Sequence, residues 1–319
     1  MRLLVTGGAG FIGSNYVRMI ATGAIDGISS LTVLDKLTYA GNVSNLDVPN
    51  SESFEFIKGD ICDSDLVDKI TKKVDAIINF AAESHVDRSI SNGREFISSN
   101  IVGTYTLLNS AMKNKIKTFL QVSTDEVYGS ISSGSWNEEC ALSPNSPYSA
   151  SKASADLLCL AYKKTHGLDV RVTRSSNNFG THQNAEKFIP KAITNLIKGE
   201  QVPVYGDGMN IRDWIHVDDN CRALHQVLIS GNAGDIYNIG GGNELTNLEL
   251  VNSILQIMEL KSDMLLFVKD RAGHDSRYSV DAGKIQSELG FYPKVDFRNG
   301  LADTINWYRN NKSWWNTSS

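Results

Sequence analysis

The stretch Thr6-Gly7-Gly8-Ala9-Gly10-Phe11-Ile12-Gly13 decides the fold, because it joins the short apolar run Arg2–Thr6 to the helix-length segment Phe11–Ala21. Glycines at these spacings permit a tight strand-to-helix turn and let the backbone and the helix N-terminus approach a pyrophosphate. An acidic residue, Asp35, ends the next apolar run 22 positions after Gly13. The combination predicts a dinucleotide-binding βαβ unit, and a glycine-rich turn without a nucleotide is the weaker alternative.

Two acidic positions are expected to contact the dinucleotide. A carboxylate at Asp35 can accept hydrogen bonds from the adenosine ribose and repels a 2′-phosphate, which favours NAD over NADP, although the adjacent Lys36 leaves NADP open. Asp60-Ile61 can border the adenine ring, and the alternative for Asp60 is the N-cap of the next helix. The stretch Phe80-Ala81-Ala82-Glu83-Ser84 ends a further apolar run, where a doubly wound sheet borders its ligand crevice.

Apolar, β-branched runs alternate with helix-length segments up to about Asn177, which predicts an α/β fold: a Rossmann-type doubly wound parallel sheet with helices on both faces. The expected strands are Arg2–Thr6, Leu31–Leu34, Phe54–Ile57, Ala76–Phe80, Thr118–Val122 and Val170–Thr173. The expected helices are Phe11–Ala21, Asp65–Lys72, Glu95–Lys113 and Ser149–His166.

After Asn177 the pattern predicts a smaller C-terminal α/β lobe over one end of the sheet. The elements expected there are helices Pro190–Lys198, Val217–Ile229, Asn247–Met258 and Gly300–Asn310 and strands Pro203–Tyr205 and Ile236–Ile239. We therefore expect a dinucleotide-binding domain with the catalytic residues over 1–176. A mostly substrate-binding lobe is expected over 177–319, with some segments returning to the sheet.

Composition excludes several classes of protein. The 319 residues are 41% hydrophobic and 21% charged with a net charge of −5, which excludes a disordered chain and disfavours a nucleic-acid or membrane-surface binder. The scattered Cys62, Cys140, Cys159 and Cys221 lack metal-ligand spacing, so we expect reduced thiols, no metal site and a cytoplasmic protein. No apolar run reaches the length of a membrane span or of a signal-peptide core.

Tyr148 and Lys152 are four residues apart at the start of an expected helix and so share one helix face. A free tyrosine, with a pKa near ~10, is a poor base at neutral pH. A neighbouring ammonium group and a positively charged nicotinamide ring both favour the phenolate, which can then remove a proton from a hydroxyl. The alternative is an ordinary pair on a helix surface.

The segment Ser123-Thr124-Asp125-Glu126-Val127-Tyr128-Gly129 places two carboxyl groups side by side after the fifth expected strand. In a continuing strand Asp125 and Glu126 would point to opposite faces, so the chain must leave the strand for both to face one substrate. Elimination of water needs an acid for the leaving hydroxyl and a base for a carbon-bound proton, and adjacent carboxyl groups with separated pKa values suit these roles. Thr124 can orient the substrate, and a solvated acidic turn is the alternative.

These motifs resemble the extended short-chain dehydrogenase/reductase family and, within it, the dTDP-glucose 4,6-dehydratases. The motifs that carry the resemblance are TGGAGFIGS (6–14), DKLTYAGN (35–42), AAESHVDRSI (81–90), STDEVYG (123–129), SPYSASKAS (146–154), SNNFG (176–180), PVYGDG (203–208), IRDW (211–214), YNIGGGNE (237–244) and DRAGHDSRY (270–278).

The resemblance implies conversion of dTDP-D-glucose to dTDP-4-keto-6-deoxy-D-glucose and water, with NAD retained through the cycle. Tyr148 would take the proton of the C4 hydroxyl during hydride transfer to NAD. Glu126 would then remove the C5 proton while Asp125 protonates the departing C6 hydroxyl, and hydride would return to C6. No net oxidation occurs in such a cycle.

The resemblance also implies which residues surround the ligands. Those expected at the cofactor are Gly7, Gly10, Phe11, Ile12, Gly13, Asp35, Lys36, Leu37, Thr38, Asp60, Ile61, Phe80, Ala81, Ala82, Ser84, Ser99, Tyr148, Lys152 and Asn178. Those expected at the nucleotide sugar are Ser84, Thr124, Asn177, Glu186, Lys187, Phe188, Pro203, Val204, Tyr205, Arg212, Asn247, Asp270, His274, Arg277 and Tyr278. From the residues alone, a structural ion pair between Arg212 and Asp213 and a structural role for His274 are the alternatives.

Four positions depart from the family pattern around the expected nucleotide pocket: Phe179, Ala185, Ala272 and Ser276 stand where Tyr, Pro, Pro and Arg are usual. They leave the nucleotide base and the sugar tolerance open, so UDP-glucose is an alternative substrate. The helices 95–113 and 149–166 resemble those of a four-helix dimer interface, which implies a homodimer, and packing on the sheet alone is the alternative.

Two other functions compete with dehydration. One is an NAD-dependent nucleotide-sugar 4-epimerase or decarboxylase, and Asp125-Glu126 disfavours it because an epimerase has no C6 hydroxyl to expel. The other is a non-enzymatic NAD-sensing regulator, which the presence of Tyr148 and Lys152 disfavours.

Overall fold

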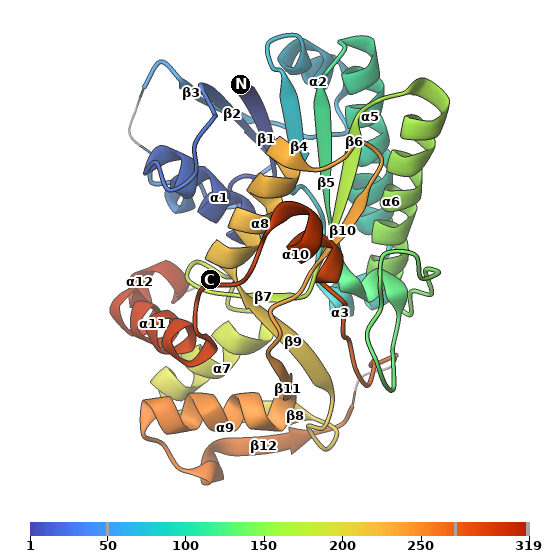
Figure 1. The fold of residues 1–319 in the computed structure, drawn as a ribbon. Coiled ribbons are helices and arrows are strands. Elements are labelled where there is room, and N and C mark those ends of the chain that lie inside the picture. Colours follow the sequence, from blue (N-terminus) through green and yellow to red (C-terminus); the bar gives the residue numbers. More distant parts are fainter. Residues whose placement is uncertain (49–50, 271–272, 317–319) are drawn as a thin grey trace.

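Seven parallel strands form the central sheet, in the order β10-β6-β5-β4-β1-β2-β3 (Figure 1). The computed structural model describes residues 1–48, 51–270 and 273–316. The strands of this sheet are β1 (Arg2–Thr6), β2 (Ser30–Asp35), β3 (Phe54–Lys58), β4 (Ala76–Asn79), β5 (Thr118–Thr124), β6 (Val170–Ser175) and β10 (Ile236–Ile239). The chain order reverses between β1 and β4, and the predicted Rossmann-type doubly wound fold is confirmed.

Helices cover both faces of this sheet, because successive side chains of each strand point to opposite faces. Leu3 and Val5 of β1 pack in one core with Leu224, while Leu4 packs in the other with Leu107. The first face carries α1 (Phe11–Ala21), α8 (Val217–Ser230) and α10 (Gly283–Leu289). The second carries α2 (Ser64–Thr71), α5 (Thr104–Lys113) and α6 (Pro147–His166).

The single helix predicted over 95–113 is wrong in its first half. The structure has a short α4 (Arg94–Phe96), a π-helical segment Ile97–Gly103, and then α5. Within that segment, the Asn100 side-chain amide donates to the Glu83 carbonyl oxygen at 3.0 Å and to Ser151 Oγ at 2.8 Å, and its oxygen accepts from the Glu83 N–H at 2.9 Å. These tertiary hydrogen bonds give a physical reason for the wider helical turn, which is common near functional sites.

The C-terminal lobe lies beyond the carboxyl end of the sheet, in the lower half of Figure 1. It contains a three-stranded sheet of β7 (Asn177–Phe179), β9 (Ile211–His216) and β11 (Glu244–Thr246), and a pair of β8 (Val202–Tyr205) with β12 (Leu265–Val268). Its helices α7 (Phe188–Lys198), α9 (Asn247–Met258), α11 (Phe297–Asn310) and α12 (Lys312–Trp315) share one apolar core with Trp214.

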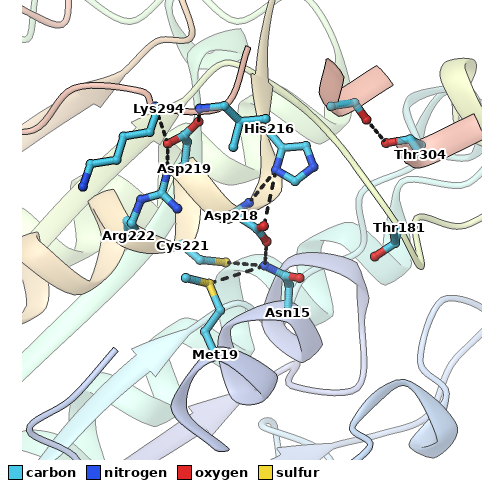
Figure 2. Close-up of polar contacts among 12 residues, drawn as sticks. Asn15, Met19, Thr181, His216, Asp218, Asp219, Cys221, Arg222, Lys294 and Thr304 are labelled. Atoms are coloured by element: carbon cyan, nitrogen blue, oxygen red, sulfur yellow. Dashed lines mark hydrogen bonds and ion pairs between the residues drawn. The ribbon is translucent and has the colours of Figure 1, made fainter. Parts of the chain in front are cut away.

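Two elements from the second half of the chain belong to the large sheet. β10 pairs in parallel with β6, and α8 buries Leu224 and Val227 against the sheet face. The start of α8 also ties distant segments together (Figure 2). Asp218 accepts from Asn15 Nδ2 of α1 at 2.8 Å, and the Asp219 carboxylate pairs with Arg222 and accepts from the Lys294 N–H at 2.8 Å.

The four cysteines are free thiols. Across residues 1–48, 51–270 and 273–316, no helix is both long and apolar enough to cross a membrane. The same residues contain no group of three or more His, Cys, Asp or Glu side chains that could hold a metal ion. Ala272, one of the departures from the family pattern, lies outside the described residues.

Candidate active site

A cavity of about 900 Å³ opens where the large sheet meets the C-terminal lobe. Residues at or just after the carboxyl ends of the parallel strands line it: Gly7 after β1, Asp35 in β2, Asp60 after β3, Phe80 after β4, Thr124 in β5 and Ser175 in β6. The proposed catalytic residues Thr124, Asp125, Glu126, Tyr148 and Lys152 all line it. So do all the predicted cofactor residues except Leu37, and all the predicted substrate residues except Val204, Asp270 and Arg277.

The four exceptions have identifiable partners elsewhere. Val204 is fully buried in the core of the C-terminal lobe, and the backbone N–H of Leu37 donates to Asp35 at 2.7 Å. Arg277 makes two hydrogen bonds of 2.8 Å each to the Glu244 carboxylate. The Asp270 carboxylate lies 2.7 Å from Nδ1 of His274, and His274 itself lines the cavity.

Of the departures from the family pattern, only Ala185 is found in the cavity lining among the described positions. Phe179 is buried in the core of the C-terminal lobe, with its ring 5.3 Å from His216 and 5.2 Å from Phe297. Ser276 pairs its hydroxyl with that of Ser130 at 2.9 Å. The expectation that all these positions surround the nucleotide pocket is therefore wrong for Phe179 and Ser276.

The glycine-rich turn is packed tightly enough to need its glycines. Gly7 has φ +68°, and a Cβ there would lie 2.5 Å from the backbone nitrogen of Ala81. A Cβ at Gly13 would lie 2.4 Å from the carbonyl oxygen of Gly7. Gly10 is the N-cap of α1 and, among the described residues, no side chain caps this helix, so its first N–H groups face the cavity. This cradle fits a pyrophosphate.

Asp35 holds the turn and faces the same cavity. Its carboxylate accepts from the Ala9 N–H at 2.9 Å, and burial raises the pKa of Asp35. Lys36 forms an ion pair of 2.8 Å with Asp60, which raises the pKa of Lys36. Because Asp60 already neutralises this ammonium group, the ion pair disfavours the alternative in which Lys36 binds the 2′-phosphate of NADP. The N-cap of α2 is Asp63, so the alternative role for Asp60 is wrong.

Tyr148 and Lys152 are buried side chains on the first turns of α6, so the surface-pair alternative is wrong. Pro147 and a capping box between Ser146 and Ser149 begin the helix. Lys152 Nζ donates to the carbonyl oxygen of Val122 at 2.6 Å, and burial lowers the pKa of Lys152.

The expected phenolate at Tyr148 is not favoured by the protein alone. Burial raises the pKa of Tyr148 well above its usual range, and the nearby carboxyl groups of Glu126 and Asp125 raise it further. These two carboxyl groups lie more than twenty residues before Tyr148 in the sequence and become its neighbours only in the folded chain. The phenol is therefore protonated at neutral pH until a positive charge comes close to it.

Asp125 and Glu126 reach the same cavity because the chain leaves β5 after Thr124 and forms a 3₁₀ turn over Asp125–Tyr128. The Thr124 hydroxyl begins this turn by accepting from the Glu126 N–H at 3.3 Å. Asp125 is buried and Glu126 is half-buried, so the alternative of a solvated acidic turn is wrong. The two neighbouring carboxyl groups thus have different environments.

Burial raises the pKa of Asp125 to about 8, and the charges of Glu126 and Asp213 contribute to the rise. Its Oδ1 accepts from the Thr124 hydroxyl at 3.2 Å, while Oδ2 has no hydrogen-bond partner among the described residues. Asp125 is therefore largely protonated at neutral pH, as a general acid must be.

Arg212 and Asp213 are neighbours in β9 and therefore point to opposite sides. Asp213 accepts from the backbone N–H groups of Gly241 and Asn243 at 2.8 and 2.7 Å. Arg212 is buried, donates to the Asp275 carbonyl oxygen at 2.9 Å and lies 4.2 Å over the Tyr278 ring. Its guanidinium group brings positive charge to the cavity wall.

Sequence reasoning missed a cluster at the cavity wall that joins three segments. The Arg88 guanidinium lies 4.0 Å from the Tyr39 ring centroid and 2.5 Å from the Glu186 carboxylate, and Asn184 donates to the Tyr39 carbonyl oxygen at 3.3 Å. Tyr39 and Arg88 stand in motifs that follow β2 and β4, so their position after strand ends was an available signal. Lys191 and Lys198 also line the cavity, at helical spacing from Lys187 along α7.

With Tyr148 and Lys152 buried on the helix that follows β5, beside a glycine-rich turn, the chain has the fold and the site of an extended short-chain dehydrogenase/reductase. More narrowly, a family profile described as GDP-mannose 4,6 dehydratase matches residues 4–304, and the chain belongs to this family.

Individual relatives narrow the comparison. The chain is 54% identical over 318 residues to a dTDP-glucose 4,6-dehydratase of Streptomyces niveus, covering 99% of this chain and 95% of that protein. Its fold matches the crystal structure of DesIV, a dTDP-glucose 4,6-dehydratase of Streptomyces venezuelae with NAD bound, with a TM-score of 0.97, 53% identity and 99% of each chain covered. A UDP-glucose 4-epimerase of Thermotoga maritima matches with a TM-score of 0.90 and 28% identity, covering 98% of this chain and all of the other. The resemblance to the dTDP-glucose 4,6-dehydratases is confirmed.

Asp125→Asn tests the raised pKa independently of any activity. The pKa of this carboxyl rises from 3.8 to about 8, so its contribution to stability is full below the unfolded value and is lost as the pH rises through about 8. Wild-type protein should lose stability relative to Asp125→Asn by up to about 1.4 kcal/mol per pH unit within that window. Urea denaturation at about pH 5.5 and about pH 7.5 measures the difference. Glu52→Gln, at an exposed position, is the control. If the difference in free energy of unfolding between wild type and Asp125→Asn is the same at both pH values, as for this control, the assignment is contradicted.

Proposed function

We propose that this protein is an NAD-dependent hydro-lyase that converts dTDP-D-glucose to dTDP-4-keto-6-deoxy-D-glucose and water. The observation that carries the proposal is the pair Asp125 and Glu126, two carboxyl groups in one cavity with different environments, next to Tyr148 and Lys152. Family membership and the dehydratase relatives support it.

The described residues fit NAD. The uncapped start of α1 and the close approach at Gly7 suit the pyrophosphate, and the Asp35 carboxylate suits the adenosine ribose. When bound, NAD⁺ would supply the hydride acceptor and a positive charge that lowers the pKa of Tyr148. We propose that residues 1–176 bind the dinucleotide and that residues 177–319 make most of the contacts with the nucleotide sugar.

The residues of the chain then act in sequence. Tyr148 takes the proton of the C4 hydroxyl, and the Lys152 ammonium stabilises the phenolate. A ketone at C4 makes the C5 proton acidic, and Glu126 removes it. Asp125, protonated at neutral pH, gives its proton to the departing C6 hydroxyl, which leaves as water. Glu126 returns a proton to C5 when the cycle closes.

Cationic and amide side chains at the cavity wall suit the nucleotide diphosphate. Arg212 and Lys187 bring positive charge, and Asn177, Asn247 and His274 line the same wall. Charged donors of this kind form the stronger hydrogen bonds to phosphate oxygens. They compensate locally for a net charge of −5 on the whole chain.

A 4-epimerase is the second candidate, because an epimerase structure matches this fold closely. Epimerisation at C4 needs the tyrosine and lysine but neither an acid for a C6 hydroxyl nor a base for C5–H. The buried, protonated Asp125 beside Glu126 favours dehydration.

We propose a homodimer in which α5 and α6 meet their copies. The two helices pack side by side, and apolar side chains on them and on the preceding π-helical segment are exposed: Ile97, Val102, Tyr105, Met112 and Leu157. Such a patch on a folded chain marks an interface, and the one we assign is with a second copy. The cytoplasmic location stays a prediction.

Purified protein is expected to carry NAD(H) and to act without added cofactor, because the cycle ends with NAD in its starting form. Incubation with dTDP-glucose and, separately, with UDP-glucose should give the alkali-induced absorbance of a 4-keto sugar, with dTDP-glucose preferred. Absence of dinucleotide in the supernatant of denatured protein would contradict retention. Preference for UDP-glucose would contradict the assigned nucleotide.

Tyr148→Phe is expected to stop the oxidation at C4 while leaving substrate binding within about twofold, because the phenol oxygen moves the proton but does not hold the diphosphate. The loss in rate should be about 10²–10⁴-fold. Stopped-flow absorbance of the reduced dinucleotide measures the step, and calorimetric titration with dTDP measures binding. Turnover near that of wild type would mean that Tyr148 is not the base.

Glu126→Gln is expected to separate oxidation from elimination. The amide is nearly isosteric but cannot take the C5 proton, so that step should slow by about 10²–10⁴-fold while oxidation at C4 proceeds. The variant should accumulate reduced dinucleotide with little 4-keto-6-deoxy product, and deuterium uptake at C5 should fall in parallel. An unchanged rate with full deuterium incorporation would make Glu126 only a turn residue.

Leu157→Glu is expected to convert the dimer to a monomer, because it puts a charge into an apolar interface. Phe267→Glu on β12 is the matched control, since Phe267 is 55% exposed against 58% for Leu157. Light scattering after size-exclusion chromatography measures the mass. A monomeric wild-type protein, or a monomer produced equally by the control, would exclude this interface.

A further inference from the structure

Beneath the cavity, the guanidinium group of Arg174 in β6 is 2% exposed and outside the cavity lining. Its Nε donates to Asp156 Oδ2 at 3.0 Å, and a terminal nitrogen donates to the Tyr128 hydroxyl at 2.8 Å. A buried ion pair gives little net stability compared with apolar side chains of the same volume. The pair therefore suggests a role other than holding the fold together.

Through Asp156, Arg174 is connected to Lys152, which we propose acts with Tyr148 in the oxidation at C4. Asp156 lies one helical turn after Lys152 on α6, and the side chains of both are buried. The Lys152 ammonium donates to one neutral carbonyl, that of Val122, and burial lowers the pKa of Lys152 while the charge of Asp156 raises it. Both Asp156 and Lys152 are buried, so solvent screens the charge of Asp156 from the lysine only weakly.

Through Tyr128, Arg174 is connected to the turn that carries Asp125 and Glu126, the residues proposed to eliminate water. Tyr128 is the last residue of the 3₁₀ turn that begins with Asp125 and Glu126. Its hydroxyl accepts from Arg174 and donates to Asn238 Oδ1 of β10 at 2.9 Å. The Tyr128 ring is stacked with Trp136 at 6.2 Å and lies under the Arg174 guanidinium at 4.7 Å. The Thr124 hydroxyl holds the start of this turn, and the contacts of Tyr128 with Arg174 and Asn238 hold its end.

We propose that Arg174, Asp156 and Tyr128 form a positioning cluster that orients both sets of catalytic groups, with Asp156 serving Lys152 and Tyr128 serving the Asp125–Glu126 turn. The proposal rests on the proposed function. It predicts that loss of one contact slows one chemical step and spares the other, which a purely structural cluster would not do.

Asp156→Asn removes the charge and keeps the shape. The groups that face position 156 are Lys152 and Cys159 on α6, Ser123 on β5, and Arg174 on β6 with Tyr128 behind it. Without the carboxylate, Lys152 loses its proton at lower pH, so oxidation at C4 should begin to decline at a lower pH than in wild type. The oxidation rate above that pH should fall about tenfold. Deuterium uptake at C5, per oxidised substrate, should not change.

Tyr128→Phe keeps the ring and leaves the Arg174–Asp156 pair intact, so it also serves if Asp156→Asn does not fold. The 3₁₀ turn loses its link to Asn238, and small displacements of catalytic groups are costly. Deuterium uptake at C5 and product formation should fall about ten- to hundredfold. The rate at which reduced dinucleotide appears should stay within about twofold of wild type.

Matched controls are available elsewhere in the chain. Asp219→Asn alters another buried Asp–Arg pair, and Tyr237→Phe removes another buried phenol hydroxyl, bonded to Glu288 at 3.0 Å. Both steps are followed in single turnovers from about pH 6 to about pH 9, with thermal melting of every variant. If each cluster variant slows both steps equally, or the controls do the same, the positioning role is refuted. If wild type itself neither oxidises dTDP-glucose nor exchanges C5–H, the proposed function fails instead.

Discussion

The contact between the backbone of Gly7 and the end of β4 is the constraint on which the site depends. A Cβ at position 7 would lie 2.5 Å from the Ala81 nitrogen, so the two backbones meet with no side chain between them. Since β1 and β4 are neighbours in the sheet, this contact brings the glycine-rich turn level with the segment that follows β4. Glu83 in that segment is bound to Asn100, and Asn100 to Ser151 of α6. The helix that carries Tyr148 is thereby fixed relative to the turn.

Residues of the site that are adjacent in sequence differ in their exposure to solvent. Asp125 and Glu126 share one short turn, yet only Asp125 is fully withdrawn from water, and burial moves its pKa to about 8. Lys152 and Tyr148 are also buried, and burial disfavours the charged form of each. Burial therefore shifts the pKa of Asp125, Tyr148 and Lys152 toward the neutral form, and an opposite charge placed beside any of them shifts its pKa back.

Local patterns predicted the fold well because a doubly wound sheet repeats one unit. Each strand of the large sheet was visible as a short apolar run, and the spacing from Gly13 to Asp35 marked the first βαβ unit, whereas β7, β9, β11 and β12 of the other lobe were not predicted. The π-helical segment was not predictable, because its stabilising hydrogen bonds from Asn100 join it to Glu83 and Ser151, which are distant in sequence. The raised pKa of Tyr148 was missed for a similar reason: it depends on carboxyl groups that only the folded chain brings near.

Pocket residues were less predictable than the residues of the glycine-rich turn. In β8 the alternation of a strand directs Pro203 and Tyr205 to the cavity and Val204 to the core, so a contiguous motif cannot be assigned to the pocket as a block. Arg277 carries the charge expected of a phosphate ligand, but Glu244 of β11 binds it. Such competition between a ligand and a neighbouring side chain is decided by tertiary structure.

The seventh strand of the large sheet comes from residues 236–239, about sixty residues after β6. During synthesis, β6 therefore remains an open edge until the chain has passed through the first part of the other lobe, from β7 to β9, and through α8. A fragment that ends near residue 176 would expose the unpaired backbone groups of Val172 and Arg174 and would lack the helix α8 that covers one sheet face. The large sheet is therefore complete only with α8 and β10 from the second half of the chain, and an exchange of C-terminal lobes between related enzymes would have to carry these two elements with the N-terminal part.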